Sequence, residues 1–268
     1  MFGSIDCMHW QWERCPVAWK GQFTTGDKKV PTLILEAVAS HDLWIWHAFF
    51  GVAGSNNDIN VLNQSTVFIN ELKGQAPRVQ YFVNGNQHKI GYFLADGIYP
   101  EWTVFVKSIR LPITEKEKLY AQQQEGARKD IERAFGVLQR RFSILKRPPR
   151  LYDRAVLRDV VLACIILHNM IVEDEKEQEI IEENLDLNVP PSSSTVQEPE
   201  FSPEDIPLER TLEKDTSIRD RSAHRQLKND LVEHIWNKFG GRAHILGTCD
   251  YLKISTVFIY IFYVISVI

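Results

Sequence analysis

The chain has 268 residues, 44% of them hydrophobic, which is enough for one sizeable domain with appendages. Its four cysteines have no C-x-x-C pair, which argues against a disulfide framework and a zinc module, and the N-terminus has no secretory signal pattern. The net charge of −4 hides a division: residues 173–215 carry fifteen Asp/Glu and three Lys/Arg, a charge of −12, so the remainder carries about +8. A basic body suits a polyanionic partner, although a solvated helix face gives the same count.

The first 100 residues predict strands that lead to carboxylates. Residues 1–5 form the end of a short apolar strand running into Asp6. Residues 32–39 and 44–52 predict two strands of a hairpin, followed by turn formers at 54–60 and a short helix near 61–72. The apolar run 91–95 predicts a buried strand that stops at Asp96. Asp6 and Asp96 are therefore both expected at strand ends.

The second half predicts helices and a linker. A long helix is expected over 114–142, opened by a capping box of Thr114 with Glu117, and a second apolar helix over 155–172. Acidic residues, prolines and serines then dominate. The expected organisation is a domain at 1–174, an acidic disordered linker at 175–220, an amphipathic helix at 221–241 and an apolar tail at 242–268.

The tail has two interpretations. Residues 254–268 are almost wholly apolar, yet they are shorter than the roughly 20 residues that span a bilayer. Counting from Tyr251 reaches eighteen residues but includes Lys253. We therefore favour a tail foreign to the native protein over a membrane anchor.

Three carboxylates are candidates for chemistry. Glu132 follows the apolar stripe of the long helix by one residue, after Ile131, so it can face the sheet that bears Asp6 and Asp96. Acids from two strands and a helix can converge on Mg²⁺, which prefers oxygen ligands, and two such ions can cleave a phosphodiester. Spacing alone leaves other roles open: Glu132 as a surface partner of Arg128 or Arg133, and Asp96-Gly97 as a simple turn.

Four segments carry a family resemblance. In chain order they are GSIDCMHW, AGSNNDINVL, GYFLADGIYP and ARKDIERAFGVLQRRF. Together, over residues 1 to about 174, they resemble the DDE-type transposases of the PIF/Harbinger superfamily, nearest to its plant ALP-like branch. The resemblance implies an RNase H-like α/β fold, a mixed sheet flanked by helices. It also implies Asp6, Asp96 and Glu132 as catalytic acids that bind Mg²⁺ or Mn²⁺ together with Asp58.

The same resemblance implies DNA as substrate, contacted by Arg128, Arg133, Arg140 and Arg141. It also implies a nuclear location and a Myb-like accessory protein. Complete members carry a helix-turn-helix region before the catalytic domain, so we expect this chain to be truncated at its N-terminus. Two functions follow: a metal-dependent DNA endonuclease, or a catalytically silent, domesticated protein that associates with DNA or chromatin.

The orientation of Asp58 distinguishes a metal site from acids that have unrelated local roles. From local sequence it reads as the N-cap of a short helix, accepting from the amide of Asn60 or Val61. The family resemblance instead places its carboxylate near the metal, pointing towards Asp6 and Asp96. Because the two roles need opposite orientations, the structure can distinguish them.

Overall fold

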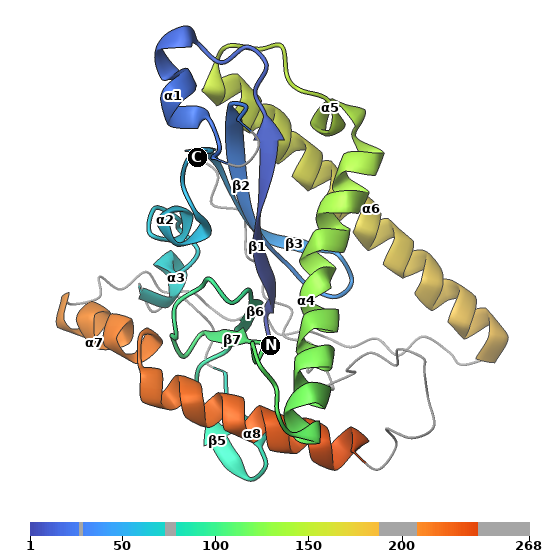
Figure 1. Cartoon of the computed structure of the whole chain (residues 1–268). Coiled ribbons are helices and arrows are strands. Elements are labelled where there is room, and N and C mark those ends of the chain that lie inside the picture. Colours follow the sequence, from blue (N-terminus) through green and yellow to red (C-terminus); the bar gives the residue numbers. More distant parts are fainter. Residues whose placement is uncertain (27–28, 73–78, 188–207, 241–268) are drawn as a thin grey trace.

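The computed structural model describes residues 1–26, 29–72, 79–187 and 208–240, and its centre is a five-stranded sheet (Figure 1). The strand order is β3-β2-β1-β6-β7. β1, β2 and β3 are antiparallel, whereas β6 runs parallel to both β1 and β7. The predicted mixed α/β sheet is therefore confirmed. The strands are β1 (Gly3–Gln11), β2 (Thr32–Ala39), β3 (Ile45–Ala53), β6 (Phe93–Ala95) and β7 (Phe105–Lys107), with a separate hairpin of β4 (Tyr81–Val83) and β5 (Asn86–His88).

Helices cover both faces of the sheet. Long helices α4 and α6 pack on one face, and the short α2 packs on the other (Figure 1). The helices are the 3₁₀ turn Val17–Trp19, α1 (Lys20–Phe23), α2 (Asp58–Leu62), α3 (Ile69–Leu72), α4 (Glu115–Arg141), α5 (Ser143–Lys146), α6 (Arg154–Leu187), α7 (Leu208–Ile218) and α8 (Arg221–Phe239).

Strand β2 is buried along its whole length because it lies between these two layers. Leu33 and Leu35 join the core under α4 and α6, whereas Ile34 packs with Val61 of α2. A strand covered on both faces is expected to be a continuous apolar run rather than an alternating one. The predicted hairpin is confirmed, with β2 and β3 joined at residues 40–44.

Helix α4 begins as the sequence predicts. The Thr114 side chain accepts from the Glu117 amide, and Glu117 accepts in return from the Thr114 amide, so the capping box is present. The buried stripe of Ala127, Ile131 and Leu138 then turns towards the sheet. Glu132, one residue beyond Ile131, is thereby carried to the rim of the helix–sheet contact.

Strand β1 is longer than predicted. Asp6 was expected at a strand end, but β1 continues to Gln11 because β2 pairs with it throughout, from Ser4 to Gln11. Among the described residues, β6 pairs with β1 only at Gly3 and Ser4. Asp6 therefore lies within a strand, beside the edge that β6 leaves open.

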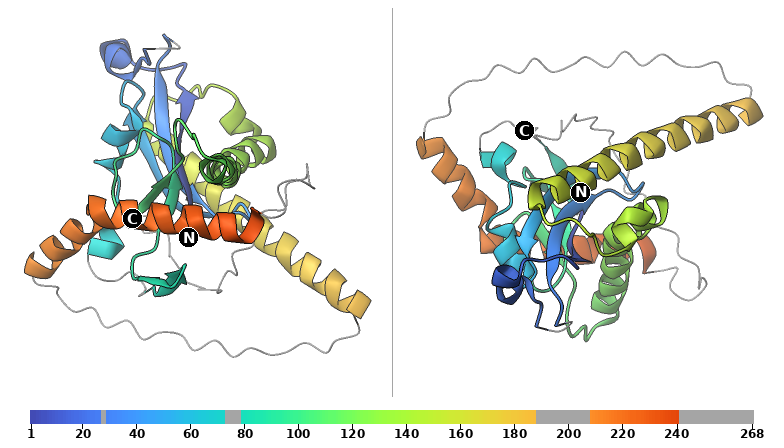
Figure 2. Two further views of the ribbon diagram at one scale, coloured as in Figure 1. Left: turned by 60° about the horizontal axis from the view of Figure 1, so that its bottom comes forward. Right: turned by 90° about the horizontal axis from the view of Figure 1, so that it is seen from above.

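The expected linker at 175–220 is helical at both ends. Helix α6 continues to Leu187 and α7 begins at Leu208, while 188–207 and the predicted tail at 242–268 lie outside the described residues. Glutamate and lysine are good helix formers, so an acidic composition does not end a helix. Helix α6 is long and apolar enough to cross a membrane, judged by length and composition only, yet it packs against β3 and α4 and extends beyond the sheet (Figure 2).

The predicted C-terminal helix forms as α8, and it belongs to the core. Leu227, Leu231 and Ile235 pack with Leu94 of β6, Val106 of β7 and Tyr120 of α4. In Figure 2 this helix lies across the end of α4 and beneath the sheet. Because α8 fills this space, the hydrophobic core around β6, β7 and α4 is completed by residues that follow the acidic segment.

Candidate acidic site at the open edge of strand β1

Asp6 and Asp96 lie on adjacent parallel strands. The register pairs Gly3 with Phe93 and Ser4 with Leu94, so Asp6 and Asp96 each follow the last paired residue of their strand by two positions. Asp96 directly follows β6 and is exposed, whereas the Asp6 side chain is 21% exposed. Each carboxylate accepts a hydrogen bond from the next amide, from Cys7 at 2.8 Å and from Gly97.

Glu132 reaches this edge through Arg128. The Ser4 hydroxyl donates to the Ala127 carbonyl at 3.2 Å, which fixes α4 against the start of β1. Arg128 Nη1 then lies 3.6 Å from Asp6 Oδ2 and 3.1 Å from Glu132 Oε1. The predicted pairing of Glu132 with Arg128 is therefore present, and the same guanidinium also bridges to the sheet.

Asp58 is not the cap of α2. That role belongs to Asn57, whose side chain accepts from the Asn60 amide at 2.9 Å, so the N-cap alternative for Asp58 is wrong. Asp58 is half-buried at the first position of the helix, where Cys7 and His9 of β1 lie near enough to oppose the rise that burial causes in its pKa. Asp58 therefore faces β1.

The pKa values of Asp6 and Asp58 respond to neighbouring carboxylates. Burial raises the pKa of Asp6 from 3.8 to about 6, against the opposing effects of the Cys7 amide and Arg128, and the charges of Asp58 and Glu132 raise it further. Burial also raises the pKa of Asp58, with Asp96 adding to the increase. Like charges disfavour ionisation of their neighbours, so these acids form one electrostatic unit that attracts cations.

The acids match a hard cation in donor type and charge. Carboxylate oxygens are the ligands that Mg²⁺ takes in proteins, and the cluster already holds a positive group in Arg128. However, within the part of the chain that the structure describes, no three His, Cys, Asp or Glu side chains stand close enough together to hold a metal ion. The predicted ligands therefore share one region without forming a ready coordination sphere.

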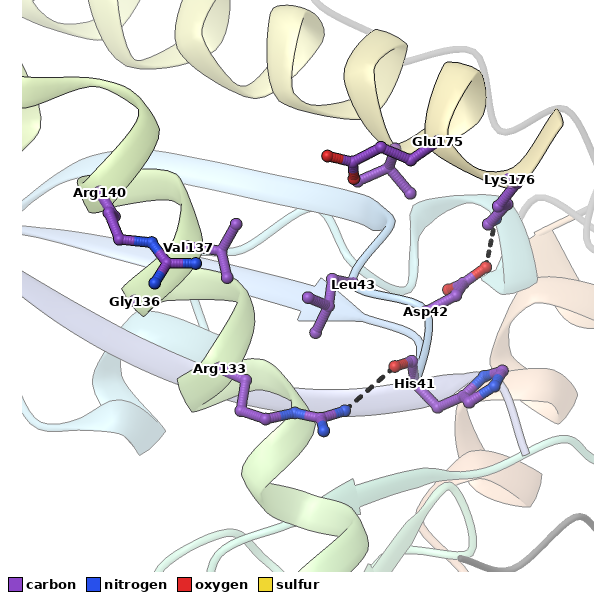
Figure 3. Close-up of a pocket in the computed structure, with 10 residues that line it drawn as sticks. His41, Asp42, Leu43, Arg133, Gly136, Val137, Arg140, Glu175 and Lys176 are labelled. Atoms are coloured by element: carbon purple, nitrogen blue, oxygen red, sulfur yellow. Dashed lines mark hydrogen bonds and ion pairs between the residues drawn. The ribbon is translucent and has the colours of Figure 1, made fainter. Parts of the chain in front are cut away.

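Three of the four arginines predicted to contact DNA lie away from the candidate acids. Arg133 donates to Asp130 at 2.7 Å and to the His41 carbonyl at 3.2 Å, and with Arg140 it lines a pocket of about 570 Å³ (Figure 3). Arg141 pairs with Glu175 beside the same pocket. None of the four candidate acids lines this pocket, which is formed by residues 41–43, 133, 136, 137, 140, 172, 175 and 176. Of the four arginines, Arg128 alone is in ion-pair contact with the candidate acids.

A further carboxylate near the site was missed from the sequence. Glu36 of β2 is fully buried, and neither of its oxygens has a hydrogen-bond partner among the described residues. It lies opposite Cys7 in the strand register and 3.6 Å from His47 Nε2, and its charge acts on Asp58. The signal was available, because Glu36 is the one charged residue within the apolar run 32–39.

Comparison with known proteins places this arrangement in a family. The family described as plant transposon protein matches residues 1–179, two thirds of the chain. No curated protein and no solved structure matches. The matched region includes Asp6, Asp58, Asp96 and Glu132 together with Arg128. The chain therefore belongs to the plant transposon protein family.

Proposed function

We propose that the chain is a transposon-derived DNA endonuclease domain that depends on a divalent cation, Mg²⁺ or Mn²⁺. Asp6, Asp96 and Glu132 are its catalytic acids, and Asp58 is a fourth metal-site carboxylate. The observation that carries the proposal is the gathering of these acids, from two parallel strands and two helices, around the open edge of β1. Acids so distant in sequence have no structural need to meet, because like charges repel.

The setting of each acid suits a large, charged substrate. Asp96 and Glu132 are exposed, so the site opens at the surface and admits a polymer, whereas Asp6 is largely buried and holds the inner position. A bound divalent cation supplies activation of water and stabilisation of a leaving oxygen in phosphodiester cleavage. This chain contributes the oxygen donors and a fixed scaffold of β1, β6 and α4.

Exposed cations beyond the acids support DNA as the substrate. Arg140, Lys146, Arg147 and Arg150 lie at the far end of α4 and in the segment after it, and all four are exposed. Arginine and lysine side chains in such a track bind phosphates without regard to sequence, with an affinity that falls as salt rises. By the same family resemblance, we propose that the protein acts on DNA in the nucleus with a Myb-like accessory protein.

A second function has two observations in its favour. The described residues contain no preformed metal group, and Arg128 is bound to two of the acids. A domesticated protein that associates with DNA or chromatin without cutting needs the basic surface but no metal. This alternative predicts salt-dependent DNA binding that is unaffected by divalent cations.

The deciding experiment is nicking of supercoiled plasmid DNA by the full chain in Mg²⁺ or Mn²⁺. Asp6→Asn and Asp96→Asn keep an oxygen that can accept from the next amide, so folding is retained, and we expect nicking to fall at least about 100-fold. The matched control is Asp159→Asn, an exposed acid on α6 that pairs only with its neighbour Arg158 among the described ion pairs. Nicking that survives both site variants refutes the proposed acids, and DNA binding without nicking by the parent establishes the second function.

A further inference from the structure

We propose that the surface formed by residues 14–19 and 146–154 binds single-stranded DNA, with unpaired bases stacked on Trp19 and Tyr152. The inference rests on the proposed function, since it takes DNA as the ligand and names the form of DNA that the chain holds. It involves none of the four candidate acids and no metal ion. This aromatic surface lies beyond the end of β1, in the part of the molecule that carries α1 and α5 (Figure 1).

Two aromatic rings are exposed on the aromatic surface. The Trp19 residue is 42% exposed and Tyr152 60%, whereas the other six tryptophans, all within the described residues, are buried or partly buried. Large aromatic side chains usually bury, and exposed ones that gather in one region mark a binding surface. Every nucleic-acid base has a π-face, so exposed rings can stack on bases of any sequence.

Two buried tryptophans hold the aromatic surface together. Trp10 Nε1 donates to the Arg147 carbonyl at 3.0 Å, and Trp12 Nε1 donates to the Leu151 carbonyl at 2.9 Å. The ring of Trp12 also lies 6.2 Å from the ring of Trp19, measured between centroids. Trp12 is fully buried, so both segments are fixed to the end of the sheet. Loops positioned by a rigid scaffold often carry binding residues.

Arginines accompany both rings. Arg154 Cζ lies 5.3 Å from the centroid of the Trp19 ring. Arg14 Cζ lies 5.9 Å from the centroid of the Tyr152 ring, and Arg14 Nη1 donates to the Tyr152 hydroxyl at 3.2 Å. Residues 12–23 and 146–159 together contain seven Lys/Arg and only three Asp/Glu. The aromatic surface therefore combines groups that stack on bases with groups that bind phosphates.

The aromatic surface continues the basic track that we propose for DNA. Lys146, Arg147 and Arg150 of that track belong to the segment that leads to Tyr152, and all three are exposed. A DNA strand whose phosphates follow these cations would bring its bases to the rings. Bases in a duplex stack on one another, so only unpaired bases are available to Trp19 and Tyr152. The expected ligand is therefore single-stranded.

The test is binding of fluorescein-labelled oligothymidylate to the full chain in EDTA, measured by fluorescence anisotropy beside a duplex of equal length. Tyr152→Ala should weaken oligothymidylate binding at least about fivefold, the lower limit for loss of one base–aromatic stack. Its duplex affinity should stay within about twofold of the parent, because paired bases do not use the ring. Tyr152→Phe keeps the ring and should bind both DNAs as the parent does.

The matched control is Phe82→Ala. Phe82 is also an exposed aromatic side chain, but it lies on β4, whose partner β5 is at the opposite end of the molecule from α1 (Figure 1). Its oligothymidylate affinity should match that of the parent. Equal oligothymidylate binding by Tyr152→Ala and the parent overturns the inference, as does an equal loss in Phe82→Ala or a parent that binds no oligothymidylate.

A measurement on the parent chain covers the case in which Tyr152→Ala does not fold. An oligonucleotide that carries iododeoxyuridine cross-links under ultraviolet light to an aromatic side chain stacked on that base. The cross-linked peptides should contain Trp19 or Tyr152. Cross-links confined to other aromatic side chains overturn the inference.

Plasmid nicking separates the two proposals, because the binding measurements are made without a metal ion. Weaker oligothymidylate binding by Tyr152→Ala, without nicking by the parent in Mg²⁺ or Mn²⁺, supports the inference and refutes the nuclease. Nicking by the parent, together with equal oligothymidylate binding by Tyr152→Ala, supports the nuclease and overturns the inference.

Discussion

Helix α4 borders two charged regions, which differ in the ratio of carboxylates to positively charged side chains. At the pocket beside the β2–β3 turn, carboxylates have their own cations. Asp42 pairs with Lys176 (Figure 3), and Asp130 pairs with Arg133 and Glu175 with Arg141. At the open edge of β1, Arg128 pairs with Asp6 and Glu132, and no ion pair to Asp58 or Asp96 is found among the described residues. Matched charges hold elements of the fold together, whereas an excess of one sign is unfavourable for folding, as expected of the site that we propose.

The contrast is sharpest between Asp6 and Asp42. Burial raises the pKa of Asp6 to about 6. Burial also acts to raise the pKa of Asp42, but hydrogen bonds from Lys176 and Ser40 and the Lys176 charge outweigh it, so the pKa of Asp42 is lowered. The folded state therefore favours the protonated form of one acid and the ionised form of the other, and the two contribute to stability with opposite dependence on pH.

The largest expected effect is from Asp6→Asn, measured in EDTA. A folded-state pKa of about 6 above the unfolded 3.8 means that the Asp6 contribution is fully present below about pH 4 and is lost as pH rises through about 6. Near pH 8 the variant should be more stable than the parent by about 2 kcal/mol, somewhat below the full value of a two-unit shift because Asp6 is partly solvated. Urea unfolding at pH 4 and pH 8 checks this, and a variant less stable at both pH values contradicts it.

Asp42→Asn should have the opposite sign and a smaller size. It removes the charge that Lys176 and Ser40 stabilise, so we expect a loss of about 1–2 kcal/mol at pH 7. The lowered pKa of Asp42 contributes stability above the unfolded pKa of 3.8, and that contribution disappears as pH falls through the folded value. The difference between variant and parent in urea unfolding should therefore shrink below about pH 4. A gain in stability at pH 7 would remove the distinction between the two regions.

The smallest expected effect separates the neighbours Asn57 and Asp58. Asn57→Ala removes the cap of α2 and should lower thermal stability by about 1 kcal/mol. Asp58→Asn removes a carboxylate whose pKa is raised by burial and should cost no stability at pH 7. Thermal unfolding of both variants side by side provides the comparison. A larger loss for Asp58→Asn would make Asp58 a structural residue.

Elements with strong local signals were predictable from the sequence. The capping box at Thr114, the hairpin and the buried strand before Asp96 all formed as expected, since each depends on neighbouring residues. The extension of β1 was missed because pairing with β2, rather than an apolar run, specifies residues 7–11. Strands β4, β5 and β7 have only three residues each, too few to show a period.

The residues of the candidate site could be predicted from the sequence, but their contacts in space could not. The family resemblance selected Asp6, Asp58, Asp96 and Glu132, and helical spacing suggested that Glu132 pairs with Arg128. The approach of Arg128 to Asp6 depends on how α4 is placed on β1, and no local pattern encodes that placement. The placement of α4 also explains why Arg133 points towards the β2–β3 pocket. One step along a helix rotates a side chain by about 100°, so Arg133 faces a different direction from Glu132.

The placement of α8 shows that the region matched by the family is shorter than the region that packs into one hydrophobic core. The family match ends at residue 179, but Leu227, Leu231 and Ile235 cover Leu94, Val106 and Tyr120. A fragment ending at residue 179 would expose this apolar surface beside the strand that leads to Asp96, and exposed surface of this kind promotes aggregation. The C-terminal helix thus shields apolar residues of the sheet from solvent, and fragments designed for expression should extend to Phe239.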